Sequence, residues 1–290
     1  MKILKLLILN PLMRFFYEFF RRLTNTVVGS YLFCYIILRR GFGKYYLDFL
    51  TGNNIKNLII NSINILAAKK LKKYSTNSLS IEDLVKLGFS FQFSYSFPKF
   101  NFNYKISLKT FQNKFEIIKF LKLIKKIEPK IILEIGTAMG GTLFLLSRIS
   151  DFKATLISVD LLNGKIGGDK KSTFFRNFAQ NRQKIRIIKG DSHKLSTFQN
   201  IKKILKNRKV DLLFIDGDHT YSGVKEDFEK YKVLVKNGGL ICLHDIVPGP
   251  YDNVGGVPDF WREIQENYDT YEIVENWNQG GYGIGIVFIR

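Results

Sequence analysis

Two short segments carry carboxylate and imidazole groups that could bind a divalent cation together. Asp216 and His219 directly follow an apolar run, and Asp245 follows the next apolar run along the chain. If the two runs are neighbouring strands of a parallel sheet, their carboxyl ends lie about 4.8 Å apart. Asp216 and Asp245 could then share one hard cation such as Mg²⁺. His219 would lie over this cation, where a neutral imidazole could accept a proton from a hydroxyl group that the metal acidifies.

A glycine-rich turn at residues 134–142 could hold a nucleotide-like ligand. Gly136, Gly140 and Gly141 stand between an apolar run and a helical segment, where glycine lets a ligand approach the backbone and the helix N-terminus. Their spacing differs from Gly-x-Gly-x-x-Gly, and the acidic Glu134 disfavours a pyrophosphate. A cofactor with a cationic amino-acid end would tolerate this carboxylate. A plain tight turn is the alternative interpretation.

Polar residues also follow the next two apolar runs. Asp160 lies 24 residues beyond Gly136, where a carboxylate can accept hydrogen bonds from both ribose hydroxyls of a nucleoside. Asp191 and Ser192 follow the third run and are placed to meet an adenine edge. In open α/β sheets ligands bind outside the carboxyl ends of the strands, so these residues predict one binding crevice.

Positioning these residues requires a doubly wound, mostly parallel α/β sheet. Short apolar runs after residue 130 alternate with helical segments of about 10 to 15 residues, and continuous Ile, Leu and Val runs are typical of parallel strands covered on both faces. Only a turn separates the last two runs, which predicts an antiparallel hairpin at the sheet edge. The predicted strands are 131–135, 155–160, 185–189, 210–216, 240–245, 271–275 and 284–289.

Three helices are predicted from capping residues and apolar spacing. Ser80 begins a short helix to about Leu87, Ser107 caps a helix that runs to about Ile127, and residues 222–235 form a third. Aromatic residues alternate with polar residues between Phe89 and Phe97, which suits either a strand or an irregular aromatic arm.

The charge of the chain is concentrated in its first half. Of the net charge of +20 over 290 residues, residues 1–127 contribute 22 basic and 5 acidic side chains. Such asymmetry points to anionic partners such as lipid or nucleic acid, or to an ordinary Lys-rich surface. The opening residues interleave apolar clusters with basic pairs, but the longest run, residues 27–38, falls short of the roughly 20 residues of a membrane span. Amphipathic helices at a membrane interface and a helical cap both remain open.

These features divide the chain into three parts. We expect a basic, apolar helical region over residues 1–74, a linker and aromatic arm over 75–106, and the α/β domain over 107–290. The two cysteines, Cys34 and Cys242, provide neither a disulfide framework nor a cysteine zinc site, which favours a reducing cytoplasm.

The α/β part resembles a known enzyme family. The glycine turn, the acidic strand ends and the segments 214–221 and 238–245 together resemble class I S-adenosylmethionine-dependent methyltransferases. The resemblance is closest to the metal-dependent O-methyltransferase branch that includes macrolide-sugar O-methyltransferases and cephalosporin hydroxylase-like proteins. It implies a Rossmann-like methyltransferase sheet, S-adenosylmethionine as cofactor and Mg²⁺ as metal. The sugar-modifying members carry a second acid before the last metal aspartate, whereas this chain has His244 there.

The resemblance also assigns roles to individual residues. It implies a proton-accepting base at His219, metal ligands at Asp216 and Asp245, and acceptor contacts near Trp261. The implied cofactor-binding residues are Glu134, Gly136, Thr137, Gly140, Gly141, Thr142, Asp160, Leu161, Asp191, Ser192 and Asp216.

We therefore expect an O-methyltransferase that acts on a hydroxyl group of a small molecule, saccharide or glycolipid. The basic first half would hold it at the inner surface of an anionic membrane, and a homo-oligomer is compatible with the sequence. An RNA methyltransferase, a non-catalytic membrane or scaffold protein that retains the fold, and an NAD-dependent oxidoreductase are the alternatives. Nucleic acid is the less favoured partner, because the basic half contains no recognisable RNA-binding module.

Overall fold

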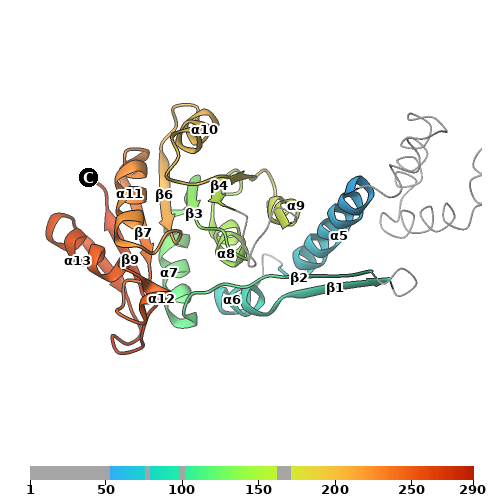
Figure 1. Cartoon of the computed structure of the whole chain (residues 1–290), viewed down its shortest axis with the longest axis horizontal. Coiled ribbons are helices and arrows are strands. Elements are labelled where there is room, and N and C mark those ends of the chain that lie inside the picture. The colour runs from blue at the N-terminus through green and yellow to red at the C-terminus, as the bar shows by residue number, and fades with distance from the viewer. Residues whose placement is uncertain (1–52, 76–78, 98–101, 162–170) are drawn as a thin grey trace, which may run out of the picture. The chain divides into compact units, whose positions relative to one another are not determined.

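The computed structural model describes residues 53–75, 79–97, 102–161 and 171–290 (Figure 1). The chain divides into units of residues 1–67 and 68–290, and the boundary falls within helix α5 (Asn53–Tyr74). The amphipathic segments expected within residues 1–50 lie outside the described residues. Among the helices that the structure does describe, none combines the length and hydropathy that a membrane span requires.

In the described residues of the second unit, seven strands form one sheet in the order β5-β4-β3-β6-β7-β9-β8. The five strands β3 to β7 run parallel, and β9 pairs antiparallel with both β7 and β8. This confirms the predicted doubly wound, mostly parallel sheet with an antiparallel hairpin at its edge. The strands are β3 (Ile131–Ile135), β4 (Thr155–Asp160), β5 (Lys184–Lys189), β6 (Val210–Ile215), β7 (Val235–His244), β8 (Thr270–Ile273) and β9 (Ile284–Phe288).

Helices cover both faces of this sheet (Figure 1). Leu133 and Ile135 of β3 belong to a buried cluster that includes Phe228 of α11 and Ile264 of α13. On the other face the ring of Phe214 in β6 lies near the ring of a residue of α7, Phe120, with centroids 5.5 Å apart. The helices are α6 (Ile81–Ser90), α7 (Lys114–Ile127), α8 (Gly141–Ile149), α9 (Ser172–Arg176), α10 (Leu195–Leu205), α11 (Tyr221–Lys232), α12 (Tyr251–Val254) and α13 (Val257–Asn267).

The aromatic alternation forms a β-hairpin outside the main sheet. Strand β1 (Gln92–Phe97) pairs antiparallel with β2 (Phe102–Ser107), so the strand interpretation of this segment is confirmed. The prediction that Ser107 caps a helix was wrong, because Ser107 is the last residue of β2. The helix begins seven residues later at Lys114, where the side chain of Asn113 accepts a hydrogen bond from the Phe115 amide at 2.8 Å.

Two other predicted boundaries also shift. Ser80 caps α6 as predicted, through a 3.0 Å bond from the Asp83 amide, but this helix continues to Ser90. Helix α11 ends at Lys232 rather than at Val235, because the Val235 residue already pairs with Val210 in the sheet. When apolar residues continue from a helix directly into a strand, the sequence pattern does not show where the helix ends.

A buried carboxylate fastens the connection between β8 and β9 to α7. Glu116 is fully buried, and its Oε1 accepts hydrogen bonds from the Glu275 amide at 3.1 Å and the Gln279 side chain at 2.7 Å. Its Oε2 accepts a 2.8 Å bond from the Gly283 amide. Three donors thus converge on one side chain and fix the segment that leads to β9.

Replacing Glu116 by Gln should destabilise the fold. An amide would present an NH₂ group to donors that need an acceptor, so we expect the free energy of unfolding to fall by about 3 kcal/mol. Urea denaturation followed by circular dichroism measures this change. The control is Glu128→Gln at the exposed end of α7, which should alter stability little; equal effects in both variants would contradict the assignment.

Candidate functional site

The glycine turn lies where the order of the strands reverses. Strand β3 has β4 on one side and β6 on the other, so its carboxyl end is the switch point at which open α/β sheets bind ligands. Gly136 has φ +92°, and a Cβ atom on it would lie 1.9 Å from the backbone oxygen of Asp216. The amide of Asp216 in turn donates to the Ile135 carbonyl at 2.8 Å. Only glycine can therefore occupy position 136.

Asp160 organises this turn from the end of β4. Its Oδ2 accepts hydrogen bonds from the amides of Thr137 and Ala138, both at 2.9 Å. Ala138 has a positive φ of 43°, an unfavourable conformation that these bonds help to hold. Gly140 also has a positive φ, and a Cβ there would lie 2.5 Å from the ring of Phe175. The turn thus has a defined shape before any ligand binds.

Glu134 offers a buried carboxyl group beneath the turn. It is fully buried, and Ser158 donates a short hydrogen bond to its Oε2. Burial raises the pKa of this carboxyl group to about 8, and the charges of Asp216 and Asp160 add to the shift. Its Oε1 has no hydrogen-bond partner within the described chain. A buried acceptor without a donor would suit the cationic ammonium group of a methionine-type cofactor, and the role of Glu134 in cofactor binding stays a prediction.

Gln112 is a site residue that the sequence analysis missed. Its Nε2 donates to Asp216 Oδ2 at 2.8 Å, and its Oε1 accepts from the hydroxyl of Thr142 at 2.8 Å. A Cβ on Gly141 would lie 2.4 Å from the backbone of Thr110, so the segment before α7 packs directly on the start of α8. Assigning residues 107–127 to a helix concealed this role.

The predicted acid and histidine cluster forms at the ends of β6 and β7. These strands pair in parallel, and ligand atoms of Asp216, His219 and Asp245 lie within 4.8 Å of one another. His219 Nε2 is 3.4 Å from Asp216 Oδ1, and His219 Nδ1 is 3.6 Å from Asp245 Oδ2. Two carboxylates and one imidazole at this separation are a donor set that fits a divalent cation.

His244 lies against both carboxylates. Its Nδ1 is 3.2 Å from Asp216 Oδ1 and 3.2 Å from Asp245 Oδ2, and the residue is 4% exposed. Burial alone would lower its pKa, but the two carboxylates outweigh burial and hold the pKa well above its ordinary value. The same imidazole holds the pKa of Asp216 well below its usual range despite burial. At the position where the resembled branch has a second acid, this chain thus has an imidazole whose charged form the two carboxylates favour.

His219 is oriented by the segment after β7. Its Nδ1 lies 2.5 Å from the carbonyl oxygen of Asn253, so this nitrogen carries the proton and Nε2 faces Asp216. The Gly256 amide donates to the His219 carbonyl at 2.8 Å and fixes the loop further. The hydrogen bond with Asp216 raises the pKa of His219 to about 9. The neighbouring carboxylate thus favours the charged imidazole, and the predicted role of His219 as a base stays a prediction.

The loop after β5, which the sequence predicts to meet an adenine edge, contacts side chains of α11, among them a buried acid. Asp191 accepts a 2.9 Å bond from the His193 amide, and Ser192 accepts one from the Tyr231 hydroxyl at 2.7 Å through its carbonyl. His193, which the sequence analysis did not single out, places Nε2 3.4 Å from the fully buried Asp227. These contacts anchor the loop after β5.

Leu161, at the predicted ribose position, is 55% exposed. It follows Asp160, whose carboxylate binds the glycine turn. The predicted roles of Leu161, Asp191 and Ser192 in cofactor binding stay predictions.

Comparison with known proteins agrees with this geometry. Residues 133–246 match a family model described as a methyltransferase domain. An uncharacterized protein of Acanthamoeba polyphaga mimivirus is 34% identical over 139 residues, which cover 47% of this chain and 61% of that protein. An uncharacterized protein of Sinorhizobium fredii is 28% identical over 49% of this chain and 16% of its own length. The chain thus covers less than two thirds of the length of either relative.

One solved structure is similar to this chain. The O-methyltransferase from Bacillus cereus in complex with SAH has a TM-score of 0.46 and 17% identity, covering 84% of this chain and 96% of that one.

Glu134→Gln should separate stability from cofactor binding. The folded pKa of about 8 exceeds the ordinary value of 4.5, so the folded chain retains a proton that the unfolded chain loses as pH rises between these values. The contribution of Glu134 to stability therefore falls from about pH 4.5 to about pH 8. An amide mimics the protonated acid, and we expect the variant to be more stable than the wild type at pH 8 by on the order of 3 kcal/mol.

The same substitution should weaken binding of S-adenosylmethionine at least about tenfold, because the neutral amide has no negative charge to pair with an ammonium group. Thermal unfolding at several pH values and calorimetric titration measure the two effects. Glu266→Gln, on the exposed face of α13, is the control. Unchanged cofactor affinity in Glu134→Gln would remove Glu134 from the binding site.

Proposed function

We infer that this chain, whose residues 133–246 form a class I S-adenosylmethionine-dependent methyltransferase domain, transfers a methyl group to a hydroxyl group of its acceptor. One observation carries the inference. The glycine turn and the Asp216, His219 and Asp245 cluster meet where the backbones of Gly136 and Asp216 touch. A cofactor on the turn and a hydroxyl group at the cluster would therefore be neighbours.

The residues around the turn would bind and orient the cofactor. Glu134 would accept a hydrogen bond from its ammonium group, and the bent turn that Asp160 holds would accept the rest of the methionine part. Asp191, Ser192 and their anchors on α11 would contact the adenosine end. When bound, S-adenosylmethionine supplies an electrophilic methyl carbon that needs only a correctly placed nucleophile. Holding the two reactants in line is thus the main task of this site.

The acid and histidine cluster would position and deprotonate the acceptor hydroxyl. Asp216 and Asp245, with His219 beside them, are the residues that would hold a divalent cation such as Mg²⁺. Such a cation supplies Lewis-acid polarisation of an oxygen and offsets the negative charge of the two carboxylates. His219, whose Nδ1 is held by the Asn253 carbonyl, presents Nε2 as the proton acceptor. Its pKa falls when the charge of the carboxylates is offset, which suits a base.

Calorimetric titration of the purified full chain tests this proposal. We expect S-adenosylmethionine to bind and NAD not to bind, and addition of EDTA to abolish methyl transfer. Asp245→Asn should retain cofactor affinity but lower kcat at least about 100-fold, because it removes one of the two carboxylates from the cluster. Asp252→Asn on the exposed turn of α12 is the matched control. Failure of S-adenosylmethionine to bind at millimolar concentration would favour a non-catalytic protein that keeps the fold.

The acceptor is proposed to be a saccharide or a glycolipid. Tyr251, Trp277 and Tyr282 are 71%, 50% and 43% exposed, although large aromatic side chains are usually buried. They lie on two segments that contact each other, since the amide of Val247 donates to the Tyr282 carbonyl at 2.9 Å. The Tyr282 amide also donates to Asp245 Oδ1 at 3.1 Å. Exposed aromatic faces beside a catalytic carboxylate suit a sugar ring.

Trp261, which the sequence placed near the acceptor, has a different role. Its side chain is 1% exposed, and its Nε1 donates to Glu272 at 2.7 Å. A Cβ on Gly285 would lie 2.5 Å from its ring. Trp261 therefore packs in the core between α13 and the sheet edge and offers no surface for stacking.

Removing the exposed aromatic rings should weaken acceptor binding alone. We expect Tyr251→Ala and Trp277→Ala each to raise KM for the acceptor about fivefold while cofactor affinity stays unchanged, because one stacking contact contributes roughly 1 kcal/mol. Methyl transfer to a panel of free sugars and glycolipids provides the assay. Tyr271→Ala removes an equally exposed ring, 51% exposed, on β8 and should leave KM unchanged. Equal KM in all three variants would contradict the acceptor proposal.

A further inference from the structure

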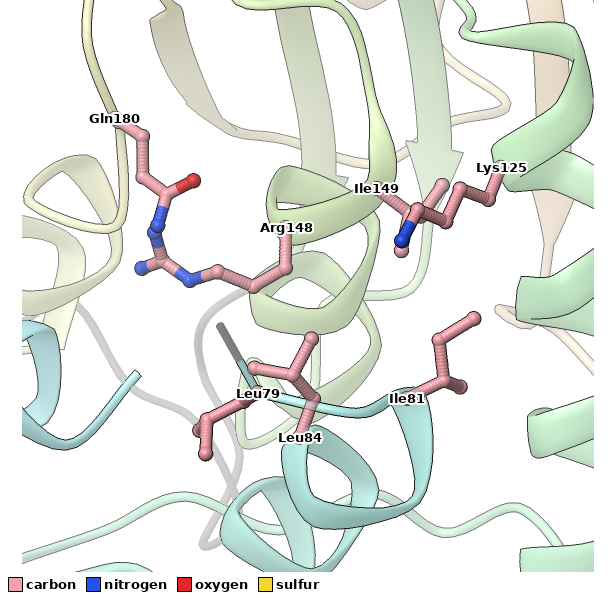
Figure 2. Close-up of a pocket in the computed structure, with 7 residues that line it drawn as sticks. All are labelled: Leu79, Ile81, Leu84, Lys125, Arg148, Ile149 and Gln180. Carbon is pink, nitrogen blue, oxygen red and sulfur yellow. The ribbon is translucent and has the colours of Figure 1, made fainter. Parts of the chain in front are cut away.

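A small pocket with two basic side chains lies between α6 and the ends of α7 and α8. Its volume is about 40 Å³, enough for roughly three water-sized spheres or one compact ion. Figure 2 shows Arg148 in its middle, between Gln180 and Lys125 and above the side chains of Leu79 and Leu84. Ile81 and Ile149 complete the lining, so the pocket combines two cations and an amide with apolar walls.

Arg148 is a partly buried cation whose hydrogen bonds are incomplete. Its Nη2 donates to the carbonyl oxygen of Phe178 at 3.0 Å, and its guanidinium carbon lies 4.7 Å from the ring centroid of Phe144. Its Nε and Nη1 are buried and have no acceptor in the described part of the chain. These nitrogens carry three N–H groups, so three donors of a buried charge are unmatched. Leaving them so is costly unless an acceptor from outside the chain meets them.

No acidic side chain among the described residues compensates this charge. Burial is the sole cause that lowers the pKa of Arg148 to about 9, without any contribution from a carboxylate. The acids of the adjacent helix α6 are engaged elsewhere: Glu82 pairs with Lys122 at 2.6 Å and Asp83 with Lys86 at 3.1 Å.

Other positive charges add to the imbalance. The pKa of Lys72 is lowered, first by burial and then by the charge of Arg148, so a further positive charge acts on Arg148. Lys125 itself lines the pocket. The pocket is therefore a concentration of positive charge.

The pocket lies away from the proposed catalytic site. Lys125 and Arg148 are in the last turns of α7 and α8, which lead into the starts of β3 and β4. The cofactor turn and the Asp216 cluster are at the opposite, carboxyl ends of the strands. A strand of five or six residues spans about 17 to 20 Å, so one ligand of 40 Å³ cannot reach both.

We propose that this pocket binds a phosphate group. A tetrahedral oxyanion offers several acceptor oxygens to the unmatched N–H groups of Arg148 and a negative charge to Lys125 and Lys72. Gln180 adds an amide that can donate to a further oxygen. The phosphate belongs either to a lipid headgroup or to a free phosphorylated metabolite, and both share this chemistry. The proposal does not depend on the methyltransferase activity.

Thermal unfolding of the full chain in potassium phosphate, against potassium chloride of equal ionic strength, tests the site. We expect phosphate to raise the Tm of the wild type by about 3 °C at saturation, with a hyperbolic dependence on concentration. Arg148→Met removes the buried charge but keeps an apolar stem of similar length, so it should fold and lose this shift. Lys125→Gln should reduce the shift, whereas Lys126→Gln, at the exposed neighbouring position, should retain it.

A second measurement separates the two sources of phosphate. Sedimentation with phosphatidylcholine vesicles that contain phosphatidic acid, and competition by glycerol 3-phosphate, are compared for the wild type and Arg148→Met. Vesicle binding that depends on Arg148 identifies a lipid headgroup, and a Tm shift without such binding identifies a free phosphate compound. No Tm shift in the wild type, or an equal shift in Arg148→Met and Lys126→Gln, would overturn the proposal.

Discussion

The close approach of β3 and β6 at their carboxyl ends is the constraint on which the site depends. The missing side chain of Gly136 leaves room for the carbonyl of Asp216, and a hydrogen bond from the Asp216 amide to Ile135 locks the two backbones together. Because the strand order reverses here, the turn after β3 is open to a ligand on one side. The carboxylate that begins the acid and histidine cluster is thereby held beside the glycine turn. One backbone contact thus joins the proposed cofactor site to the proposed catalytic cluster.

Burial of polar groups around this contact is what makes the turn specific. Glu134 lies beneath the turn, and one of its carboxyl oxygens has no hydrogen-bond partner among the described residues. Asp160 accepts hydrogen bonds from two backbone amides of the turn, so it stabilises the turn in addition to its predicted role in ligand binding. Desolvation keeps the pKa of Glu134 high until a positive group arrives, since a neighbouring cation favours the charged carboxylate. The turn thus has its shape fixed before binding, and the carboxyl group beneath it suits a ligand that carries a positive charge.

The sequence predicted the parts of this arrangement that depend on local pattern. The predicted bounds of β3 and β4 agree with the structure, because both strands are short, rich in apolar residues and buried along nearly their whole length. Gln112 and Glu116 were missed because their partners lie 30 to 167 residues away, and no local pattern reports such contacts. The same segment was assigned to a helix from Ser107, since apolar spacing continues through it. In residues 107–113 the tertiary contacts therefore outweigh the helical pattern of the sequence, and the helix begins only at Lys114.

The imidazole of His244 changes the net charge of the side chains around the candidate metal site. A cluster with a third carboxylate would attract a divalent cation strongly, whereas here His244 already lies 3.2 Å from both Asp216 and Asp245, and His219 flanks them. With both imidazoles protonated, their two positive charges match the two negative ones. A divalent cation that binds here would compete with these positive charges. Under the proposed function, a cation that offsets the charge of the two carboxylates would also favour the neutral form of His219, on which its proposed role as a base depends.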